Sequence, residues 1–491
     1  MNTARLTILH TNDMHGRMDA MARLSAAVRQ RRAQVLQAGG QALFWDAGDA
    51  LDRRYRLCSL SKGAALARVL NAMDYDLMTM GNDILLTYGP QAMAEVARRL
   101  ACPVLAANCR DGDGPLAAGL QEATTVRLQQ GPVVGVLGLT APWGGLYESF
   151  GYRFPDFVDV AMRLAAELRS QGAQILIVLS HLGLIDDQKL AESVPGIDLI
   201  VGGHSHDLLE QGIEHHGVLI AQAGCYAEAL GIVELILDGK TGRVLSRRAR
   251  VERVEEDQEP DPAVLAAIEA AEVEAAGLAA RPIGVLLSDL GLDHQEECAL
   301  GNLTADALRE RMQAEAALLL AGQLRHGLSA GTLTFGELGE AIISTANPQC
   351  TLVHGRQILA ALERCLDPAV AESRPHALRD APVGRLQISG MRVAYDDTRP
   401  VGQRVLRVWV GEALLEPDRP VRLAHSDAET TSQFGLLSLE PGQDTQTEVP
   451  TVIREVVEDY IRSHTPVGAP SGGRWQRQAA SHGSPSGDRK P

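Results

Sequence analysis

Seven short apolar segments recur along the first half of the chain. They lie within residues 5–13, 42–50, 75–83, 102–109, 132–142, 174–183 and 197–206. Between several of them the apolar residues are spaced with the period of a helix, as in residues 20–39 and 92–100. Alternation of strands with helices predicts an α/β domain, in which polar residues that follow the strands gather at one edge of a sheet.

The pattern changes at about residue 260. Residues 261–280, DPAVLAAIEAAEVEAAGLAA, predict a helix that begins with proline and joins two domains. Helical patterns at 300–312 and 355–366 and a strand pattern at 404–411 then predict an α+β domain. We expect a first domain at residues 1–257, a helical linker at 258–282, a second domain at 283–465 and, from its Gly/Ser-rich composition, a disordered tail at 466–491.

Composition narrows the class of protein. The chain has 491 residues, of which 45% are hydrophobic and 22% charged, as in a soluble protein of two or three domains. A formal net charge of −16 argues against a nucleic acid as partner. Seven scattered cysteines form no CxxC pair, and neither a signal peptide nor a membrane span is recognisable. These features predict a cytoplasmic protein with reduced thiols and no membrane partner.

Residues that can bind metal ions follow the predicted strands. They are Asp13, His15, Asp49, Asn82, His181, His204 and His206. In Asp13-x-His15 and His204-x-His206, an extended backbone would place both side chains of a pair on the same side. Carboxylate, imidazole and amide ligands together suit Mn²⁺, Zn²⁺ or Fe²⁺, and seven ligands are too many for one ion. The pattern predicts two divalent ions that share one carboxylate.

In order and surroundings, these segments resemble the metallophosphoesterase motifs of the 5′-nucleotidase family. That family also includes UDP-sugar hydrolases, cyclic-nucleotide phosphodiesterases and a sulfur-oxidation thiohydrolase. The resemblance rests on LTILHTNDMHGR, DAGDAL, YDLMTMGN, SHLG and IDLIVGGHSH. It continues more loosely, through ECALGNLTADAL and AGQLRHGLSAGTLTFGEL, to about residue 465.

The resemblance implies a four-layer α/β/β/α metallophosphoesterase sandwich followed by an α+β substrate-binding domain. It also implies how the ligands are shared between two ions. Asp13, His15, Asp49 and His206 would hold one ion, and Asp49, Asn82, His181 and His204 the other, with Asp49 as the bridge. The expected ions are Mn²⁺ or Zn²⁺, with Mg²⁺, Co²⁺ or Fe as alternatives. Such a centre activates a water and binds a phosphoryl group.

The sequence departs from the family pattern directly after Asn82. Family members usually read Gly-Asn-His-Glu there, followed shortly by an Asp that pairs with the His, whereas this chain has Asp83 and Ile84. Three interpretations of Asp83 are open: a protonated general acid, a partner for a substrate cation or hydroxyl, or a cap for the helix that begins near Pro90. We take Asp49, Asn82 and Asp83 as the candidate catalytic residues.

Three residues of the second domain are candidates for substrate binding. Arg325 matches an arginine that, in the family, binds the phosphate or nearby polar groups, although Leu320 replaces a usual Asn. Nucleotide-specific members hold the base between two aromatic rings. Arg385 stands where the first ring is expected, and Phe434 is a displaced second ring.

These observations predict a hydrolase that uses two metal ions to cleave a phosphate ester. The expected substrate is a nucleotide or another small phosphorylated metabolite, bound between the two domains. One alternative keeps the metal site but cleaves a phosphodiester, a cyclic nucleotide or a sulfur ester. Another is a metal-binding ligand sensor with little turnover.

Overall fold

The structure is a computed structural model, which describes residues 3–53, 55–129, 131–143, 145–375, 381–431 and 435–478, without the side chain of Leu146. The chain divides into two compact units, Met1–Gly277 and Leu278–Pro491. The division falls in the last turn of α8 (Pro262–Ala279), the helix that the Ala/Glu-rich segment predicts. In the described part of the chain, no helix has the length and apolar character needed to cross a membrane.

Two six-stranded sheets form the first unit. The strand order of the first sheet is β14 (Val244–Arg253), β13 (Ala229–Asp238), β1 (Thr3–Thr11), β2 (Gln41–Asp46), β3 (Leu77–Thr79) and β4 (Val104–Leu105). The order of the second is β11 (Ile213–His215), β12 (Val218–Ala221), β10 (Leu199–Val201), β9 (Ile175–His181), β7 (Val133–Thr140) and β6 (Ala123–Arg127). Strands β1 to β4 are parallel to one another, as are β7, β9, β10 and β12.

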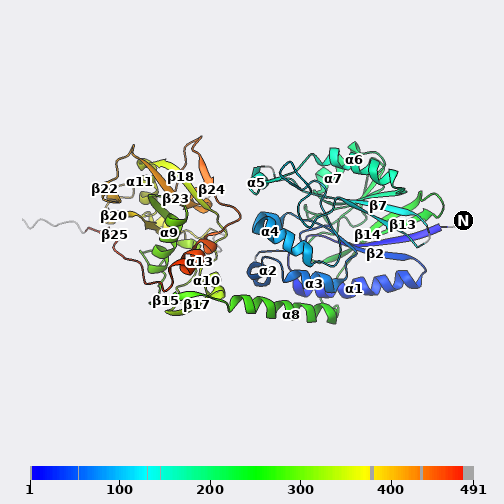
Figure 1. Ribbon diagram of the computed structural model, residues 1–491, viewed down its shortest axis with the longest axis horizontal. Coiled ribbons are helices and arrows are strands. Elements are labelled where there is room, and N and C mark those ends of the chain that lie inside the picture. The colour runs from blue at the N-terminus through cyan, green and yellow to red at the C-terminus, as the bar shows by residue number, and fades with distance from the viewer. Residues whose placement is uncertain are drawn as a thin grey trace, which may run out of the picture. The chain divides into compact units, whose positions relative to one another are not determined.

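Helices cover the outer faces of the two sheets. The first sheet is covered by α1 (Met18–Gln37), α3 (Leu66–Met73) and α4 (Asp83–Arg99), and the second by α6 (Phe157–Ser170) and α7 (Leu184–Ser193) (Figure 1). Ile8 and Trp45 of the first sheet pack with Ile177 of the second in a core between them. Every residue of β9 is buried, because layers cover both faces, and its sequence is accordingly a continuous apolar run. This architecture confirms the predicted α/β/β/α sandwich.

Short elements complete the first unit around the ends of the strands. They are α2 (Arg56–Ser61), α5 (Gly145–Glu148) and a small pair of strands, β5 (Arg110–Asp111) and β8 (Tyr152–Arg153). α2 follows the loop after β2, and α5 follows the loop after β7.

The second unit is α+β, as predicted. Its main sheet has the order β19 (Leu386–Ser389), β16 (Ala316–Leu320), β23 (Pro420–Ser426), β18 (Pro348–His354) and β24 (Thr445–Thr447). A second sheet contains β22 (Ala413–Leu414), β21 (Val405–Val410), β20 (Met391–Tyr395) and β25 (Trp475–Arg477), and β15 (Pro282–Leu286) pairs with β17 (Gly331–Thr334). The helices are α9 (Ala299–Arg311), α10 (Phe335–Ala341), α11 (Gly355–Arg364), α12 (Pro368–Ala371) and α13 (Ile453–His464), with 3₁₀ turns η1 (Ala321–Gln323) and η3 (Asp427–Thr430).

The prediction of a disordered tail from residue 466 is wrong as far as residue 478. β25 lies parallel to β20. Trp475 is buried, and its indole N–H donates to the Leu386 carbonyl over 3.0 Å. Small and polar residues make up most of this segment, but the buried ring of Trp475 and the pairing of β25 with β20 hold it in place. Residues 479–491 lie outside the described residues.

Candidate metal centre

The loops that follow neighbouring strands bring all seven predicted ligands together. Asp13 and His15 follow β1, Asp49 follows β2, Asn82 follows β3, His181 ends β9, and His204 and His206 follow β10. Backbone hydrogen bonds join the first two loops: Asp13 N–H donates to the Gly48 carbonyl (2.8 Å) and His15 N–H to the Asp49 carbonyl (3.0 Å). Both sheets therefore contribute ligands at the carboxyl ends of their parallel strands.

Asp13, His15 and His206 form the first group. The Nε2 atoms of the two histidines lie 3.0 Å apart, and Asp13 Oδ1 lies 3.3 Å from His206 Nε2 and 3.8 Å from His15 Nε2. The other oxygen of Asp13, Oδ2, accepts hydrogen bonds from Asn12 Nδ2 (2.7 Å) and from the backbone N–H of His204 (2.8 Å). Within the described residues, Oδ1 is buried without a hydrogen-bond partner. A cation among these three atoms would satisfy it.

Asp49, Asn82, His181 and His204 form the second group. Donor atoms of Asp49, His181 and His204 lie within 4.8 Å of one another. His181 Nε2 is 3.2 Å from Asp49 Oδ2 and 3.2 Å from Asn82 Oδ1, while its Nδ1 donates to the Ala47 carbonyl over 2.6 Å. The lone pair of Nε2 is therefore free to bind a metal ion.

Asp49 belongs to a third set of atoms as well. Its carboxylate, His15 and Asp83 also offer atoms within 4.8 Å of one another. Asp49 thus lies beside ligands of both groups, which is the position that a bridging carboxylate requires.

The electrostatics of the cluster favour cations. Burial lowers the pKa of His181, but the Asp49 carboxylate beside it raises that pKa to about 10. Burial raises the pKa of Asp13, but the neighbouring His206 and the charge of His181 lower it below its usual value. The Asp49 carboxylate of the protein without metal thus favours a proton on His181. A divalent ion would replace this proton on the same lone pair, so the residues fit a metal centre.

The backbone brings the ligand pairs together in a way that the sequence pattern did not predict. Asp13, His15, Asp49, His204 and His206 all have left-handed backbone conformations, with φ between 47° and 74°. β1 ends at Thr11 and β10 at Val201, so neither pair lies on an extended segment. The predicted alternation of side chains along a strand is therefore wrong. Asn, Asp and His adopt this conformation more readily than most residues, at a cost of about 1–2 kcal/mol each.

Gly81 allows the loop after β3 to approach Asp49 closely. A Cβ at this position would lie 1.9 Å from Asp49 Oδ1 and 2.2 Å from Asp49 N. The approach places the backbone N–H of Asp83 2.9 Å from Asp49 Oδ1, to which it donates. A side chain at residue 81 would separate Asn82 and Asp83 from the rest of the cluster.

The structure contradicts a capping role for Asp83. α4 begins at Asp83 itself and is interrupted at Gly89 (φ 78°, ψ −177°), so the helical stretch from Pro90 starts beyond a break. The carboxylate of Asp83 accepts hydrogen bonds from His15 Nδ1 (3.2 Å) and Asn82 Nδ2 (3.2 Å) instead. Its partners are two candidate metal ligands, because the loop turns the side chain toward the cluster.

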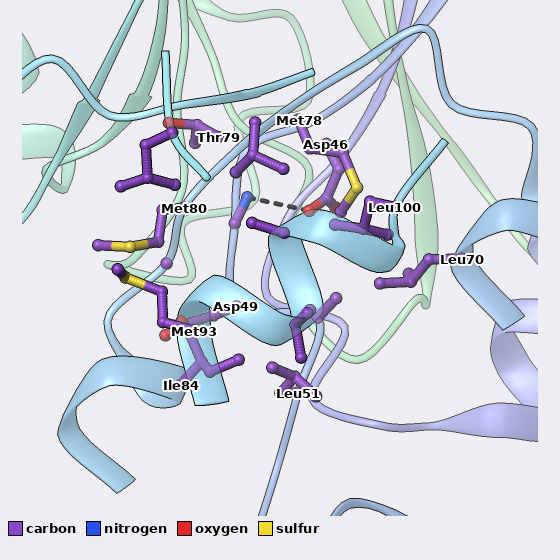
Figure 2. A pocket seen from close by; sticks show the side chains of 17 residues that line it. Asp46, Asp49, Leu51, Leu70, Met78, Thr79, Met80, Ile84, Met93 and Leu100 are labelled. Carbon is purple, nitrogen blue, oxygen red and sulfur yellow. Dashed lines mark hydrogen bonds between the residues drawn. The ribbon is translucent and has the colours of Figure 1, made fainter. Parts of the chain in front are cut away.

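A small apolar cavity lies behind Asp49. Its volume is about 50 Å³, and Met78, Met80, Ile84 and Met93 line it, with Asp46 and Asp49 at the edge (Figure 2). An apolar space of this size suits neither a phosphoryl group nor a sugar. His206 and Asp83, whose side chains are 37% and 33% exposed, mark the side of the cluster that solvent reaches.

Residues that support the ligands were not predicted. Asn12 donates to Asp13 and to the Gly224 carbonyl (2.6 Å) and accepts from the backbone N–H of Ala223 (2.9 Å), so it fixes the loop after β1. In the sequence, its position directly before Asp13 in HTND was the one feature that could have indicated this supporting role. Trp143, in the loop after β7, is 47% exposed, with its ring centroid 6.1 Å from that of His204. No spacing in the sequence indicated it.

The predicted substrate-binding residues of the second unit differ in their surroundings. Arg325 is exposed after η1, and its backbone N–H donates to the Ala341 carbonyl. Arg385 is buried, pairs with Glu296 (2.6 Å) and lies over the rings of Tyr395 and Trp475. These contacts keep its guanidinium inside the unit and give no support to the predicted role in substrate binding. Phe434 lies outside the described residues.

Comparison with known proteins agrees with this architecture. Residues 6–208 match the model of the calcineurin-like phosphoesterases, and residues 280–427 match that of the 5′-nucleotidase C-terminal domain. The chain is 27% identical to an uncharacterized metallophosphoesterase, YunD, of Bacillus subtilis (strain 168), over 79% of this chain and 84% of that protein. It is 25% identical to a snake venom 5′-nucleotidase of Naja atra, over 82% and 84%.

A solved structure gives the same assignment over nearly the whole chain. The crystal structure of a 5′-nucleotidase precursor from Thermus thermophilus covers 96% of this chain and 99% of its own, with 25% identity and a TM-score of 0.52. The two family matches fall in different units of the fold, one on the sandwich that carries the ligand cluster and one on the α+β unit. The chain therefore belongs to the 5′-nucleotidase family of metallophosphoesterases and is a phosphoester hydrolase.

Proposed function

We propose that this hydrolase depends on two divalent metal ions and cleaves the phosphate ester of a nucleotide or another small phosphorylated metabolite. The position of Asp49, beside ligands of both groups, carries the proposal. Asp13, His15, Asp49 and His206 would hold one ion, and Asp49, Asn82, His181 and His204 the other. Their mixture of carboxylate, imidazole and amide atoms suits Mn²⁺ or Zn²⁺.

Ions bound there would supply an activated water and positive charge for the phosphoryl oxygens. The protein itself contributes the positions of the metal ligands and the opening through which substrate reaches them. Buried Asp13 and His181 fix the base of the cluster, and the exposed edges of His206 and Asp83 leave one side open to substrate. The apolar cavity is small and lined mostly by apolar side chains, with carboxylates at Asp46 and Asp49, so we expect the substrate to enter from the exposed side.

Two features support a nucleotide as the substrate. The relatives that are named 5′-nucleotidases indicate the class. In this chain, the exposed ring of Trp143 beside His204 offers a planar surface near the metal centre, on which an aromatic base can stack. The exposed guanidinium of Arg325 in the second unit suits a phosphate or a neighbouring polar group.

A turnover screen tests the proposal. Protein loaded with Mn²⁺ would be assayed with 5′-mononucleotides, a sugar phosphate, p-nitrophenyl phosphate, cyclic nucleotides, a UDP-sugar and a thiosulfate ester. We expect the highest kcat/KM with a 5′-mononucleotide. Turnover of only cyclic nucleotides or the sulfur ester would overturn the substrate class, and loaded protein that hydrolyses nothing would overturn catalysis in favour of ligand sensing.

Two variants separate the contributions of base and phosphate. Trp143→Ala should raise KM for mononucleotides but leave KM for the sugar phosphate near the wild-type value, and Trp143→Phe should retain most of the binding. Arg325→Ala should raise KM for both substrates and leave kcat closer to normal. Both substrates carry a phosphate, which the guanidinium of Arg325 can bind. An equal rise in KM for both substrates in Trp143→Ala would exclude stacking on that ring.

A further inference from the structure

Asp83 contacts ligands of both metal groups, and three of its polar atoms have different partners. Its Oδ2 accepts from His15 Nδ1 over 3.2 Å, and its Oδ1 accepts from the side-chain amide of Asn82 over 3.2 Å. Its backbone N–H donates to Asp49 Oδ1 over 2.9 Å. One residue is thus bonded to a ligand of the first group, a ligand of the second group and the carboxylate beside both.

We propose that Asp83 is a positioning residue, which orients His15 and Asn82 so that each directs its metal-binding atom into the centre. The inference rests on the proposed two-metal function and assigns to Asp83 a role different from all three interpretations that the sequence left open.

The surroundings of His15 settle which ring nitrogen is free. Nδ1 faces two acceptors, Asp83 Oδ2 and the Leu51 carbonyl at 3.3 Å, so Nδ1 carries the hydrogen. The lone pair of Nε2 then faces Asp13 Oδ1 and His206 Nε2. The backbone carbonyl of Ala47 fixes His181 in the same way. A carboxylate behind a metal-binding histidine sets its tautomer and increases its basicity.

The same carboxylate settles the orientation of the Asn82 amide. Because its nitrogen donates to Asp83 Oδ1, its oxygen faces His181 Nε2 at 3.2 Å. Only the oxygen of an amide has a lone pair for a metal ion, whereas the nitrogen carries two hydrogens. Without an acceptor at residue 83, the amide would lose the bond that selects its metal-binding orientation.

This role also explains why a carboxylate can stand close to a site for phosphate. Both of its oxygens face hydrogen donors on the protein, so its negative charge is directed toward His15 and Asn82. The charge strengthens the hold of the ligands on cations. A neutral histidine at this position has a single acceptor nitrogen, so it cannot accept from both partners at once.

Metal affinity is the direct test. Protein stripped with EDTA would be titrated with Mn²⁺ in a calorimeter, and the visible absorption of the Co²⁺-loaded protein would report the ligand geometry. Asp83→Asn keeps the size of the side chain but cannot accept from both partners with carboxylate oxygens. We expect its Kd for Mn²⁺ to rise by about 10–100-fold, as is typical when a residue that hydrogen-bonds to a metal ligand is lost. We also expect a changed absorption spectrum of the Co²⁺-loaded protein.

Glu95→Gln is the matched control. It makes the same chemical change in the same helix, but the Glu95 carboxylate pairs, among the described residues, with Arg98 and Arg99 at the surface. Its Mn²⁺ affinity and Co²⁺ spectrum should equal those of wild type. The circular dichroism of the stripped variants, compared with wild type, shows whether a loss of affinity reflects unfolding. Wild-type affinity and an unchanged spectrum in Asp83→Asn would overturn the proposal.

A double-mutant cycle separates orientation from charge. If Asp83 acts through His15, the effect of Asp83→Asn on Mn²⁺ affinity should be smaller in a His15→Ala background. If Asp83→Asn changes Mn²⁺ affinity by the same factor in both backgrounds, Asp83 does not orient His15 and acts on the metal only through its charge. If the wild-type protein itself bound no Mn²⁺, the metal centre of the proposed function would fail, which is a different result from failure of Asp83 alone.

Discussion

Asp46 and Asp49 lie three residues apart in the segment DAGDA, yet they occupy different environments. Asp46 is fully buried and accepts hydrogen bonds from Thr11 Oγ1 (2.7 Å) and the Gly48 N–H (3.1 Å), and burial raises its pKa to about 7. Asp49 faces His181 and the loop after β3 instead. The motif identified Asp49, but only the fold shows that Asp46 holds the loop in place.

Asp49→Asn tests the residue on which the two-metal proposal depends. The substitution keeps the size of the side chain and removes the charge beside both ligand groups. We expect turnover of a phosphate monoester to fall by more than ~100-fold. This loss is larger than the loss of activity that is typical when a residue that only hydrogen-bonds to a metal ligand is replaced. Asp74→Asn, an exposed aspartate paired with Arg32, is the control and should keep wild-type activity. Retention of most turnover in Asp49→Asn would refute a shared carboxylate.

Asp187, in α7, provides a test by pH. It is fully buried, and burial raises its pKa to about 7 although Ser180 donates to it. The folded protein retains this proton at pH values where the unfolded chain loses it, so the contribution of Asp187 to the stability of the wild-type protein falls between about pH 4 and pH 7.

Asp187→Asn should therefore gain stability over wild type as the pH rises from 4 to 8, by on the order of 4 kcal/mol for the full shift. Urea unfolding of both proteins in EDTA measures the difference without a contribution from bound ions. A difference that does not change with pH would show that Asp187 titrates normally in the folded protein.

At the scale of elements, the sequence predicted the strands and the order of their ends, but not the conformation of the loops. Apolar runs mark strands such as β1 and β9, and the motifs place the ligands directly after or at the ends of strands. The left-handed backbone at His15 and His206 depends on contacts between loops that are far apart in the sequence. For the same reason, no local pattern revealed that Asp83 turns toward His15.

Gly81→Ala tests the close approach of two loops. Its Cβ would lie 1.9 Å from Asp49 Oδ1, so the loop after β3 must move away and take Asn82 and Asp83 with it. We expect weaker Mn²⁺ binding, turnover reduced by at least ~100-fold and a lower melting temperature. Gly277→Ala, in α8 with nothing within 4 Å of the added Cβ, should keep full activity. Normal Mn²⁺ binding by Gly81→Ala would show that the loop contact is not needed.

At the scale of the whole molecule, an acidic chain has to bind an anionic substrate. The formal net charge of −16 repels phosphate on average, so positive charge must be supplied locally at the site.

The sequence predicted both units and their classes, because strand and helix patterns extend over many residues. It did not predict the order around Trp475, since a single buried ring has little weight in a Gly/Ser-rich composition.

Removal of metal should lower the thermal stability of the protein. Ions that bind only the folded state stabilise it by about 2.7 kcal/mol when their free concentration is 100 times Kd. They also neutralise carboxylates held together at the ligand cluster. We expect a lower melting temperature in EDTA than in excess Mn²⁺, measured by calorimetry, and a much smaller difference for Asp49→Asn. An equal difference in both proteins would place the stabilising ions at another site.

The number of ions bound per chain tests the central claim most directly. Stripped wild-type protein would be reloaded with excess Mn²⁺, freed of unbound metal and analysed for manganese and protein concentration. Two groups of donor atoms predict two equivalents: Asp13, His15 and His206 form one, and Asp49, His181 and His204, with Asn82 beside His181, form the other. A reproducible value of one equivalent at saturating Mn²⁺ would contradict the two-metal centre.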